Sequence, residues 1–276
     1  MKFTKMHGCG NDYIYVNCFE EQIDDRCKTA ERISDRHFGI GSDGMICIDP
    51  SEVADFKMDM YNADGSQGKM CGNGIRCVGK YVYDYGMTDK TCITVETLGG
   101  IKTLHLNVED GAVRTVRVCM ESPILVPAQI PVLFDGDTVV AQPIEVCGKE
   151  WEITCVSMGS AHAVTFVDDV DSMELDRIGP HFEYHERFPE RINTEFIQVL
   201  DRNNIKMRVW ERGSGETLAC GTGSCASVVA CVLNDKTDNR VTVHARGGKL
   251  DIEWERDKNL IYMTGPAEIV FEGEIN

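Results

Sequence analysis

The sequence has a shortage of basic residues and lacks long apolar runs. Its 276 residues include 28 Lys and Arg against 45 Asp and Glu, a formal net charge of −17. Such a charge repels DNA, RNA and anionic membranes, so we expect none of these as partners. No segment approaches the roughly 18 consecutive apolar residues of a membrane-spanning helix. Residues 1–17 also lack the apolar core and the cleavage site of a secretory signal, so we expect a cytoplasmic protein.

The sequence also lacks the closely spaced cysteine pairs of zinc ribbons, although it contains 13 cysteines. No two of them are separated by only two residues, so we predict no metal site. Thiols stay reduced in the cytosol, and an odd number cannot all pair within one chain. Most of the cysteines lie among apolar residues, which is typical of buried core side chains. Cys71 and Cys220 differ, because each lies in a glycine-rich turn.

The composition changes once along the chain, at residues 122–143. This segment holds four of the eight prolines, so a helix is not expected and a crossover between two lobes is predicted. Segments on both sides of it alternate apolar and polar residues, as strands do. Helices are predicted only at residues 24–37, 72–86 and 221–235. A Gly-x-Gly-x-x-Gly pattern at 39–44 is predicted to be a loop, because a helical segment precedes it and a strand follows, the reverse of a dinucleotide-binding turn.

An internal repeat relates the two halves of the chain. NADGSQGKMCGNGIRCVGKYV begins at Asn62, and ERGSGETLACGTGSCASVVAC begins at Glu211. Eight residues separate Asn62 from Cys71 and Glu211 from Cys220, and the two cysteines lie 220 − 71 = 149 positions apart. The simplest explanation is a pair of similar lobes, each of which offers one cysteine turn to a shared cleft.

Each of these cysteines is predicted to lie at the N-terminus of a helix, where unpaired N–H groups carry about half a positive charge. Such groups bind a carboxylate and lower the pKa of a thiol from about 8.5 to roughly 3.5–7.5. Two helix ends at one cleft would hold one carboxylate and place two sulfurs on opposite sides of the adjacent carbon. One cysteine then acts as thiolate base, while the other donates a proton to the opposite face. The pattern predicts proton transfer at an α-carbon without a cofactor.

Five blocks resemble the diaminopimelate epimerase family, and the resemblance runs from Met1 to YMTGPA at 262–267. The blocks are HGCGNDY (7–13), RHFGIGSDG (36–44), YNADGSQGKMCGNGIRC (61–77), HERFPERIN (185–193) and WERGSGETLACGTG (210–223). The resemblance implies a cofactor-independent isomerase, usually a homodimer, that interconverts LL- and meso-diaminopimelate in lysine and peptidoglycan biosynthesis.

The resemblance also implies an α/β fold with two pseudo-symmetric lobes, each a mixed sheet curled around a central helix, and an active site in the cleft between them. The last strand returns to the first lobe. We therefore expect an N-terminal lobe of residues 1–120 plus 266–276 and a C-terminal lobe of residues 121–265.

The resemblance implies a role for each residue of the site. Cys71 and Cys220 would be the acid and base, and His162 and Glu211 would bias their protonation. Substrate contacts are implied for Asn11, Asn62, Gly72, Asn73, Ser160, Asn193, Glu211, Arg212, Gly221 and Thr222. Among these, Gly72, Asn73, Gly221 and Thr222 would offer backbone N–H groups to the reacting carboxylate, and Arg212 would pair with the distal carboxylate. The structural alternatives are a buried strand histidine for His162, a turn cap for Asn193 and a surface ion pair for Arg212.

One departure from the family pattern concerns the substrate. The family has Asn-Pro where this chain has Ser160 and Ala161, and the family asparagine contacts the distal end of the substrate. A racemase of another amino acid, such as histidine or a basic amino acid, is therefore an alternative with the same mechanism. A non-catalytic amino-acid-binding protein is a further alternative, and metal-dependent hydrolysis is disfavoured by the lack of ligand-spaced His and Cys.

Overall fold

The computed structural model describes residues 1–275 and divides the chain into two compact units. Unit 1 comprises residues 1–119 and the segment from Thr264 onward, and unit 2 comprises Met120–Met263. The chain passes between the units twice, within β8 (Ala112–Glu121) and within β17 (Leu260–Pro266). The described residues form eighteen strands and four α-helices, so the predicted mixed α/β class is confirmed. None of the helices within residues 1–275 is long and apolar enough to cross a membrane.

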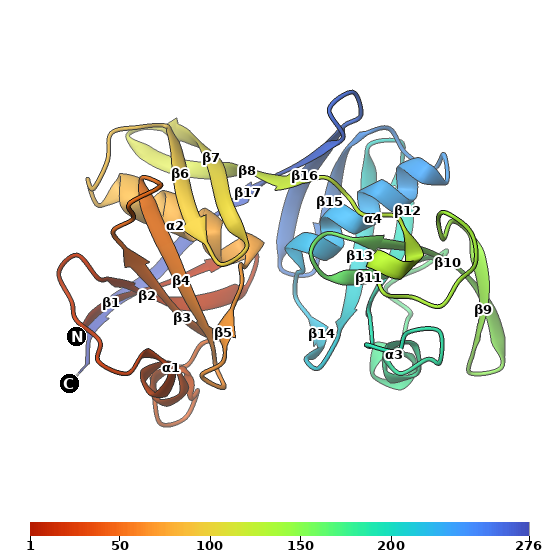
Figure 1. The fold of residues 1–276 in the computed structure, drawn as a ribbon, viewed down its shortest axis with the longest axis horizontal. Helices are drawn as coiled ribbons and strands as arrows, with labels where there is room; N and C mark the ends of the chain where they lie inside the picture. Colours follow the sequence, from red (N-terminus) through yellow and green to blue (C-terminus); the bar gives the residue numbers. More distant parts are fainter. Residues whose placement is uncertain (276) are drawn as a thin grey trace. The chain divides into compact units, whose positions relative to one another are not determined.

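Unit 1 is a mixed sheet with one helix at its centre (Figure 1). Its elements are β1 (Lys2–Gly8), β2 (Asn11–Asn17), α1 (Arg26–Ser34), β3 (Gly44–Asp49), β4 (Phe56–Asn62), β5 (Gln67–Gly68), α2 (Gly72–Asp84), β6 (Cys92–Thr97), β7 (Gly100–Glu109) and β18 (Glu268–Glu274). β1 pairs antiparallel with both β2 and β18, so the two ends of the chain lie side by side. α2 packs against β1, β2 and β7.

Unit 2 is also a mixed sheet with a central helix (Figure 1). Its elements are a 3₁₀ turn (Pro127–Gln129), β9 (Gln142–Val146), β10 (Lys149–Ser157), β11 (Ala161–Phe166), α3 (Leu175–Glu183), β12 (Asn193–Asp201), β13 (Asn204–Glu211), β14 (Gly215–Thr217), α4 (Gly221–Leu233), β15 (Arg240–Ala245) and β16 (Gly248–Glu255). α4 packs against β10, β11, β12, β15 and β16. Its residues are buried from Gly223 to Cys231, as expected of a helix that is apolar on all sides.

The internal repeat of the sequence is a repeat of strand topology. In unit 1, β1 pairs antiparallel with β2, α1 crosses over to the parallel strand β3, and β3 pairs antiparallel with β4. α2 then leads to β6, which is parallel to β4 and antiparallel to β7. Unit 2 has the same order of elements with the same strand directions, in β10, β11, α3, β12, β13, α4, β15 and β16. Each unit therefore delivers its cysteine turn at the same point, immediately before the central helix.

The helix α3 is not predicted from the sequence, because two residues inside it normally disfavour helices. Gly179 and Pro180 both lie within Leu175–Glu183. The glycine is required by packing, since a Cβ at position 179 would lie 2.2 Å from the Trp210 ring. The loop predicted at residues 39–44 is confirmed up to Gly44, where β3 begins. In the proline-rich segment 122–143, the helical structure is limited to the 3₁₀ turn Pro127–Gln129.

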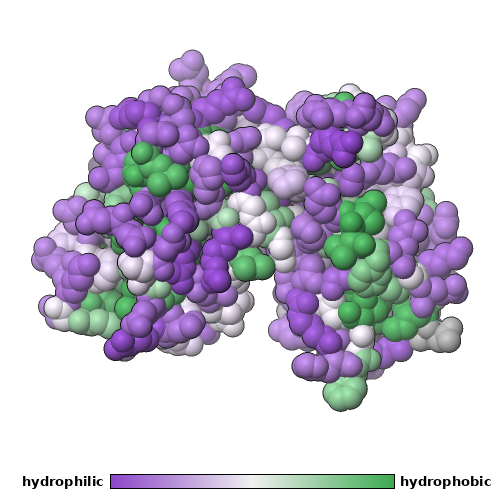
Figure 2. Space-filling model, turned by 180° about the vertical axis from the view of Figure 1, so that it is seen from behind, coloured by the Kyte–Doolittle hydropathy of each residue, from purple (hydrophilic) through white to green (hydrophobic). Residues whose placement is uncertain are grey.

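The surface is mostly hydrophilic on the face that Figure 2 shows. Hydrophobic residues form smaller groups on this face. One run of apolar side chains is exposed on a strand, at Ile269, Val270 and Phe271 of β18, which are 38%, 52% and 44% exposed. The 13 cysteines, all within the described part of the chain, form no disulfide.

Candidate active site

Cys71 is the N-cap residue of α2, as the sequence predicts. Its backbone is extended, and its Sγ accepts a hydrogen bond from the Gly74 N–H at 3.3 Å. The Cys71 thiol donates to the Asn11 side-chain oxygen, with 3.2 Å between Sγ and Oδ1. The Asn11 amide in turn donates to the Asp43 carboxylate at 2.7 Å. The structure thus brings Asn11 to Cys71, although sixty positions separate them in the chain.

The remaining predicted residues of unit 1 lie on α2 and at the end of β4. Gly72 and Asn73 form the first turn of α2. The Asn73 side chain accepts a hydrogen bond from the buried Arg76 guanidinium at 3.0 Å, so it is held inside the unit. Asn62 is the last residue of β4, and its amide donates to Ser66 Oγ at 3.0 Å.

Cys220 is the N-cap residue of α4 and repeats the geometry of Cys71. Its Sγ accepts a hydrogen bond from the Gly223 N–H at 3.4 Å and lies 3.5 Å from Thr222 Oγ1. Glycine is needed at 223, because a Cβ there would lie 2.4 Å from Glu195 Oε1 and 3.2 Å from the Cys220 Cβ. Gly221 and Thr222, the other two residues implied by the resemblance, form the first turn of the helix.

The expected lowering of both thiol pKa values is wrong. Burial raises the pKa of Cys71, although the N–H groups of Gly74 and Asn73 act in the opposite direction. Burial also raises the pKa of Cys220 well above its ordinary value, and the Glu211 carboxylate raises it further. The N–H groups at the helix ends do stabilise the thiolate, as expected. The free energy of removing a thiolate from water is larger than this stabilisation, so the net effect raises the pKa.

His162 lies within a row of polar groups inside unit 2. Its Nδ1 is 2.7 Å from Glu195 Oε1, and both side chains are fully buried. Its Nε2 is 2.9 Å from Ser160 Oγ, which lies 3.3 Å from Thr222 Oγ1. Ser160 therefore contacts the histidine and the helix that carries Cys220.

Glu195 is a site residue that none of the sequence motifs includes. It lies on β12, whose register with the parallel strand β11 pairs His162 with Asn193, two positions before Glu195. A carboxylate between Thr194 and Phe196 in an otherwise buried strand segment was the available signal, because buried carboxylates require partners. Its second oxygen, Oε2, is buried without a hydrogen-bond partner.

Asn193 and Arg212 meet in unit 2. The Asn193 side chain accepts a hydrogen bond from the Arg212 backbone N–H at 2.9 Å and donates to the Ala161 carbonyl at 2.9 Å. The Arg212 guanidinium donates to the Glu190 carbonyl oxygen at 2.9 Å. Asn193 therefore joins the start of β11 to the turn that follows Glu211, which fixes the position of both.

Glu211 ends β13 and accepts a hydrogen bond from the Thr217 hydroxyl. Burial raises its pKa above the ordinary value of 4.5, although hydrogen bonds from Thr217 and Cys220 act in the opposite direction. A raised pKa means that the native state holds a proton that the unfolded chain has released. This group therefore favours the native state below about pH 4.5, and the benefit is lost as pH rises through the native pKa.

The variant Glu211→Gln is expected to be more stable than the wild type near neutral pH and equally stable below about pH 4. The physical reason is that glutamine removes the cost of burying a carboxylate. Chemical denaturation across this pH range measures the difference. Glu216→Gln is the control with the opposite sign, because the Arg208 guanidinium holds the pKa of Glu216 below its ordinary value. That variant should lose stability near neutral pH, and parallel curves for Glu211→Gln and the wild type would contradict the expectation.

One cluster of the described residues brings together three side chains of the types that bind metal ions. Ligand atoms of His162, Glu195 and Cys220 lie within 4.8 Å of one another and are buried. Both ring nitrogens of His162, however, already lie at hydrogen-bond distance from Glu195 and Ser160. The cluster is therefore better described as a hydrogen-bonded row that ends at a thiol.

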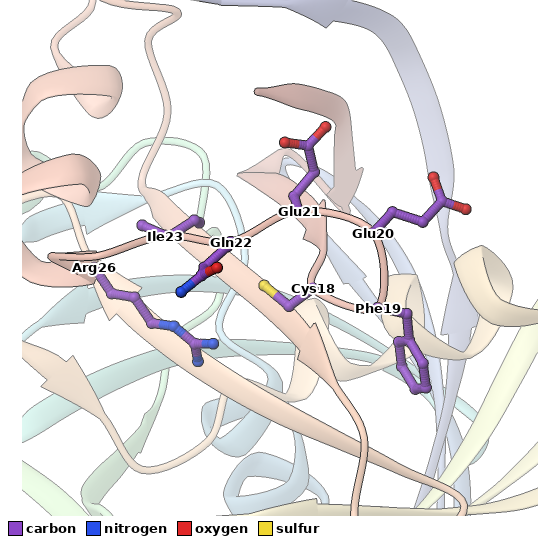
Figure 3. Close-up of a pocket in the computed structure, with 7 residues that line it drawn as sticks. All are labelled: Cys18, Phe19, Glu20, Glu21, Gln22, Ile23 and Arg26. Carbon is purple, nitrogen blue, oxygen red and sulfur yellow. The ribbon is translucent and has the colours of Figure 1, made fainter.

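A separate surface pocket of unit 1 contains none of the predicted site residues. It follows β2 and is lined by Cys18, Phe19, Glu20, Glu21, Gln22, Ile23 and Arg26 (Figure 3). The Glu20 and Glu21 carboxylates point to the side opposite that of the Arg26 guanidinium. This guanidinium is engaged by Asp49 and Asp59, each at 2.7 Å. The pocket therefore offers no unpaired cation to an anionic ligand.

Sequence comparisons identify relatives along the whole chain. The sequence model of the family described as diaminopimelate epimerase matches residues 3–126 and 154–270. A protein of Agathobacter rectalis named diaminopimelate epimerase is 61% identical and covers 100% of this chain and 99% of its own. Proteins of the same name from Acetivibrio thermocellus and Methanococcus maripaludis are 59% and 55% identical; both alignments cover 100% of this chain and 99% and 100% of the relatives.

Solved structures share the fold at low sequence identity. A Bacillus anthracis phenazine biosynthesis protein of the PhzF family is 17% identical with a TM-score of 0.72, over 100% of this chain and 99% of its own. A hydroxyproline epimerase from Agrobacterium vitis is 13% identical with a TM-score of 0.71, over 100% of this chain and 90% of its own. These similarities extend the two-lobe fold to proteins of other names.

Proposed function

Because this chain belongs to the diaminopimelate epimerase family, we propose that it inverts one α-carbon of diaminopimelate, from the LL to the meso form, in lysine and peptidoglycan biosynthesis. The chain is an isomerase of the amino-acid epimerase type. The observation that carries the proposal is the pair of cysteines, each at the N-cap of a central helix, in a chain that matches the family along nearly its whole length.

Cys71 and Cys220 act on the two faces of the reacting α-carbon. One cysteine, as thiolate, removes the α-proton, and the other, as thiol, donates a proton to the opposite face. In the reverse direction the two exchange roles. The raised pKa of both thiols supports the donor role directly, because a thiol that keeps its proton at neutral pH can deliver it.

The first turns of α2 and α4 bind the carboxylate next to this carbon. Gly72 and Asn73 supply backbone N–H groups from one helix, and Gly221 and Thr222 supply them from the other. These groups stabilise the charge that moves onto the carboxylate as the proton leaves. The reaction then needs no electron-withdrawing cofactor, and we propose that the enzyme works without one.

The remainder of the substrate is bound by four side chains, those of Asn11, Asn62, Asn193 and Arg212. Arg212 follows Glu211 directly, and Asn193 holds its backbone, which supports a role for its guanidinium in binding the distal carboxylate. Ser160 stands where the family has asparagine, yet relatives that are 51–61% identical all carry the name diaminopimelate epimerase. A racemase specific for another amino acid is therefore not favoured.

We further propose a cytoplasmic homodimer. The free thiols of the described residues support the location, because thiols stay reduced in the cytosol. The exposed run Ile269–Phe271 of β18 supports association, because monomers seldom leave adjacent large apolar side chains in water. Light scattering at several concentrations tests the assembly, and a mass equal to one chain throughout would contradict it.

Deuterium uptake tests the reaction. In D2O with LL-diaminopimelate, a reductant and no added cofactor, we expect deuterium at Cα together with conversion to the meso form. Mass spectrometry and chiral chromatography follow the two events. Binding of diaminopimelate without exchange would indicate a binding protein. Racemisation of a monoamino acid, with diaminopimelate inert, would indicate the other substrate class.

A further inference from the structure

Five polar groups of unit 2 form one continuous row that leads to Cys220. Glu195 Oε1 lies 2.7 Å from His162 Nδ1, and His162 Nε2 lies 2.9 Å from Ser160 Oγ. Ser160 Oγ lies 3.3 Å from Thr222 Oγ1, which lies 3.5 Å from Cys220 Sγ. The last of these distances is normal for a contact to sulfur, because the sulfur atom is larger than oxygen. The row joins β12, β11 and α4 within one compact unit.

We propose that Ser160 and Thr222 form a proton relay between Cys220 and His162, and that Glu195 positions the histidine for it. The inference rests on the proposed function, in which Cys220 must change between thiol and thiolate. The proposal gives the side chains of Ser160, Thr222 and Glu195 a role in the protonation of Cys220. In the relay the three side chains act through Cys220 or His162, so they are positioning groups for Cys220, whereas the backbone N–H of Thr222 keeps its proposed contact with the substrate carboxylate.

Each step of the relay moves one proton, and the total number of protons in the row does not change. The Ser160 hydroxyl donates to Thr222 Oγ1 in the structure, which is the direction that the relay needs in its thiolate state. In the thiol state the hydroxyls turn, and the Cys220 proton turns from Glu211 to Thr222. Cys220 then donates to Thr222, Thr222 donates to Ser160, and Ser160 donates to the neutral His162 Nε2. The thiol proton then passes to Thr222 Oγ1, the Thr222 proton passes to Ser160 Oγ, and the Ser160 proton passes to Nε2. The products are the Cys220 thiolate and the His162 imidazolium. Each hydroxyl has lost one proton and gained one, which is possible because a hydroxyl is both donor and acceptor.

Glu195 makes the histidine a suitable acceptor. Its carboxylate accepts the Nδ1–H in both states, so Nε2 is the nitrogen that faces Ser160 and takes the proton. The same carboxylate stabilises the imidazolium, as an aspartate does in a serine protease triad. On the other side of the row, the new thiolate accepts from the Gly223 N–H and from the Thr222 hydroxyl.

The charges around Cys220 explain why such a relay is useful. Glu211 and Glu195 both face this thiol and disfavour its thiolate. Glu211 also faces His162 and Glu195, and Cys155 faces Glu195. A thiolate among carboxylates needs a positive charge nearby, and protonating His162 provides one inside the same unit. An asparagine at 160 could not serve in this way, because its amide does not release and take up a proton at a single atom.

The test is an alkaline titration of the full-length enzyme without substrate. The ultraviolet absorbance of thiolate is recorded for each protein and for the same protein carrying Cys220→Ala, and the difference gives the ionisation of Cys220. Ser160→Ala and Thr222→Val interrupt the row, whereas Ser160→Thr and Thr222→Ser keep both hydroxyls. We expect the midpoint to rise by about one pH unit or more, a tenfold loss of thiolate at fixed pH, in the first two proteins. The other two should titrate like the wild type.

Ser227→Ala is the matched control, because Ser227 is a buried serine of the same helix whose hydroxyl donates to the Gly223 carbonyl at 2.7 Å. It should leave the midpoint unchanged. An unchanged midpoint in Ser160→Ala and Thr222→Val, or a wild type that shows no Cys220 thiolate before it unfolds, overturns the relay. The titration needs no turnover. If the midpoint shifts in Ser160→Ala and Thr222→Val but the wild type takes up no deuterium from D2O, the proposed function fails and the relay stands.

Discussion

Replacing Cys71 or Cys220 with alanine is expected to lower kcat for the proposed epimerisation by about 10²–10⁴-fold, the usual contribution of a positioned acid or base. Inversion needs a proton removed from one face and another delivered to the opposite face, so neither cysteine can replace the other. Chiral chromatography of the products measures the loss. Each single variant should also retain slow exchange at one face without inversion, because one thiol remains in place.

Cys92→Ala is the control for this pair. Cys92 is an exposed cysteine of β6 in unit 1, and its replacement should leave kcat at the wild-type value. Circular dichroism verifies that the fold of each variant is intact. Inversion at the wild-type rate in either Cys71→Ala or Cys220→Ala would eliminate the two-cysteine mechanism, whatever the substrate.

The second large effect is expected on stability, in Arg76→Ala. Arg76 is fully buried inside unit 1. Its Nε donates to the Pro266 carbonyl at 3.1 Å, and its guanidinium donates to the Asn73 side chain at 3.0 Å. Each buried acceptor that loses its donor costs about 1–3 kcal/mol, and the missing side chain leaves a cavity. We expect the free energy of unfolding to fall by about 3–5 kcal/mol, measured by urea denaturation.

Lys28→Ala provides the comparison for Arg76→Ala. The Lys28 side chain is 84% exposed and pairs with Asp25 at 3.0 Å on the surface of the same unit. Surface pairs of this kind contribute little, so the denaturation curve should match that of the wild type. If Arg76→Ala matched it as well, the connection from α2 to Pro266 would have no role in stability.

The sequence predicted the elements that carry the cysteines because their signals are local. A cysteine followed by Gly-x-Gly and an apolar run marks the start of both α2 and α4, and the side-chain caps of Cys71 and Cys220 agree with it. The helix α3 was missed because its Gly179 is explained only by Trp210, a partner thirty-one positions away.

Two properties of the site depend on packing rather than on local pattern. The pKa of Cys220 follows from its burial and from Glu211, so a rule for solvent-exposed helix ends gave the wrong direction. Glu195 contacts His162 only because β11 and β12 are parallel in one particular register. Neither the depth of a side chain nor the register of two strands separated by a helix can be read from a single sequence.

The return of β18 to unit 1 sets an order for biosynthesis. Unit 2 is one uninterrupted stretch of chain, whereas β1 has β2 on one side and gains its second neighbour only from Glu268–Glu274. Until the ribosome has released β18, β1 is an edge strand with unpaired backbone groups. Pro266, the acceptor for Arg76, also arrives at that stage. Unit 1 therefore begins before unit 2 and is completed after it, and a nascent chain that stalls before Glu268 leaves the Cys71 unit open while unit 2 is already whole.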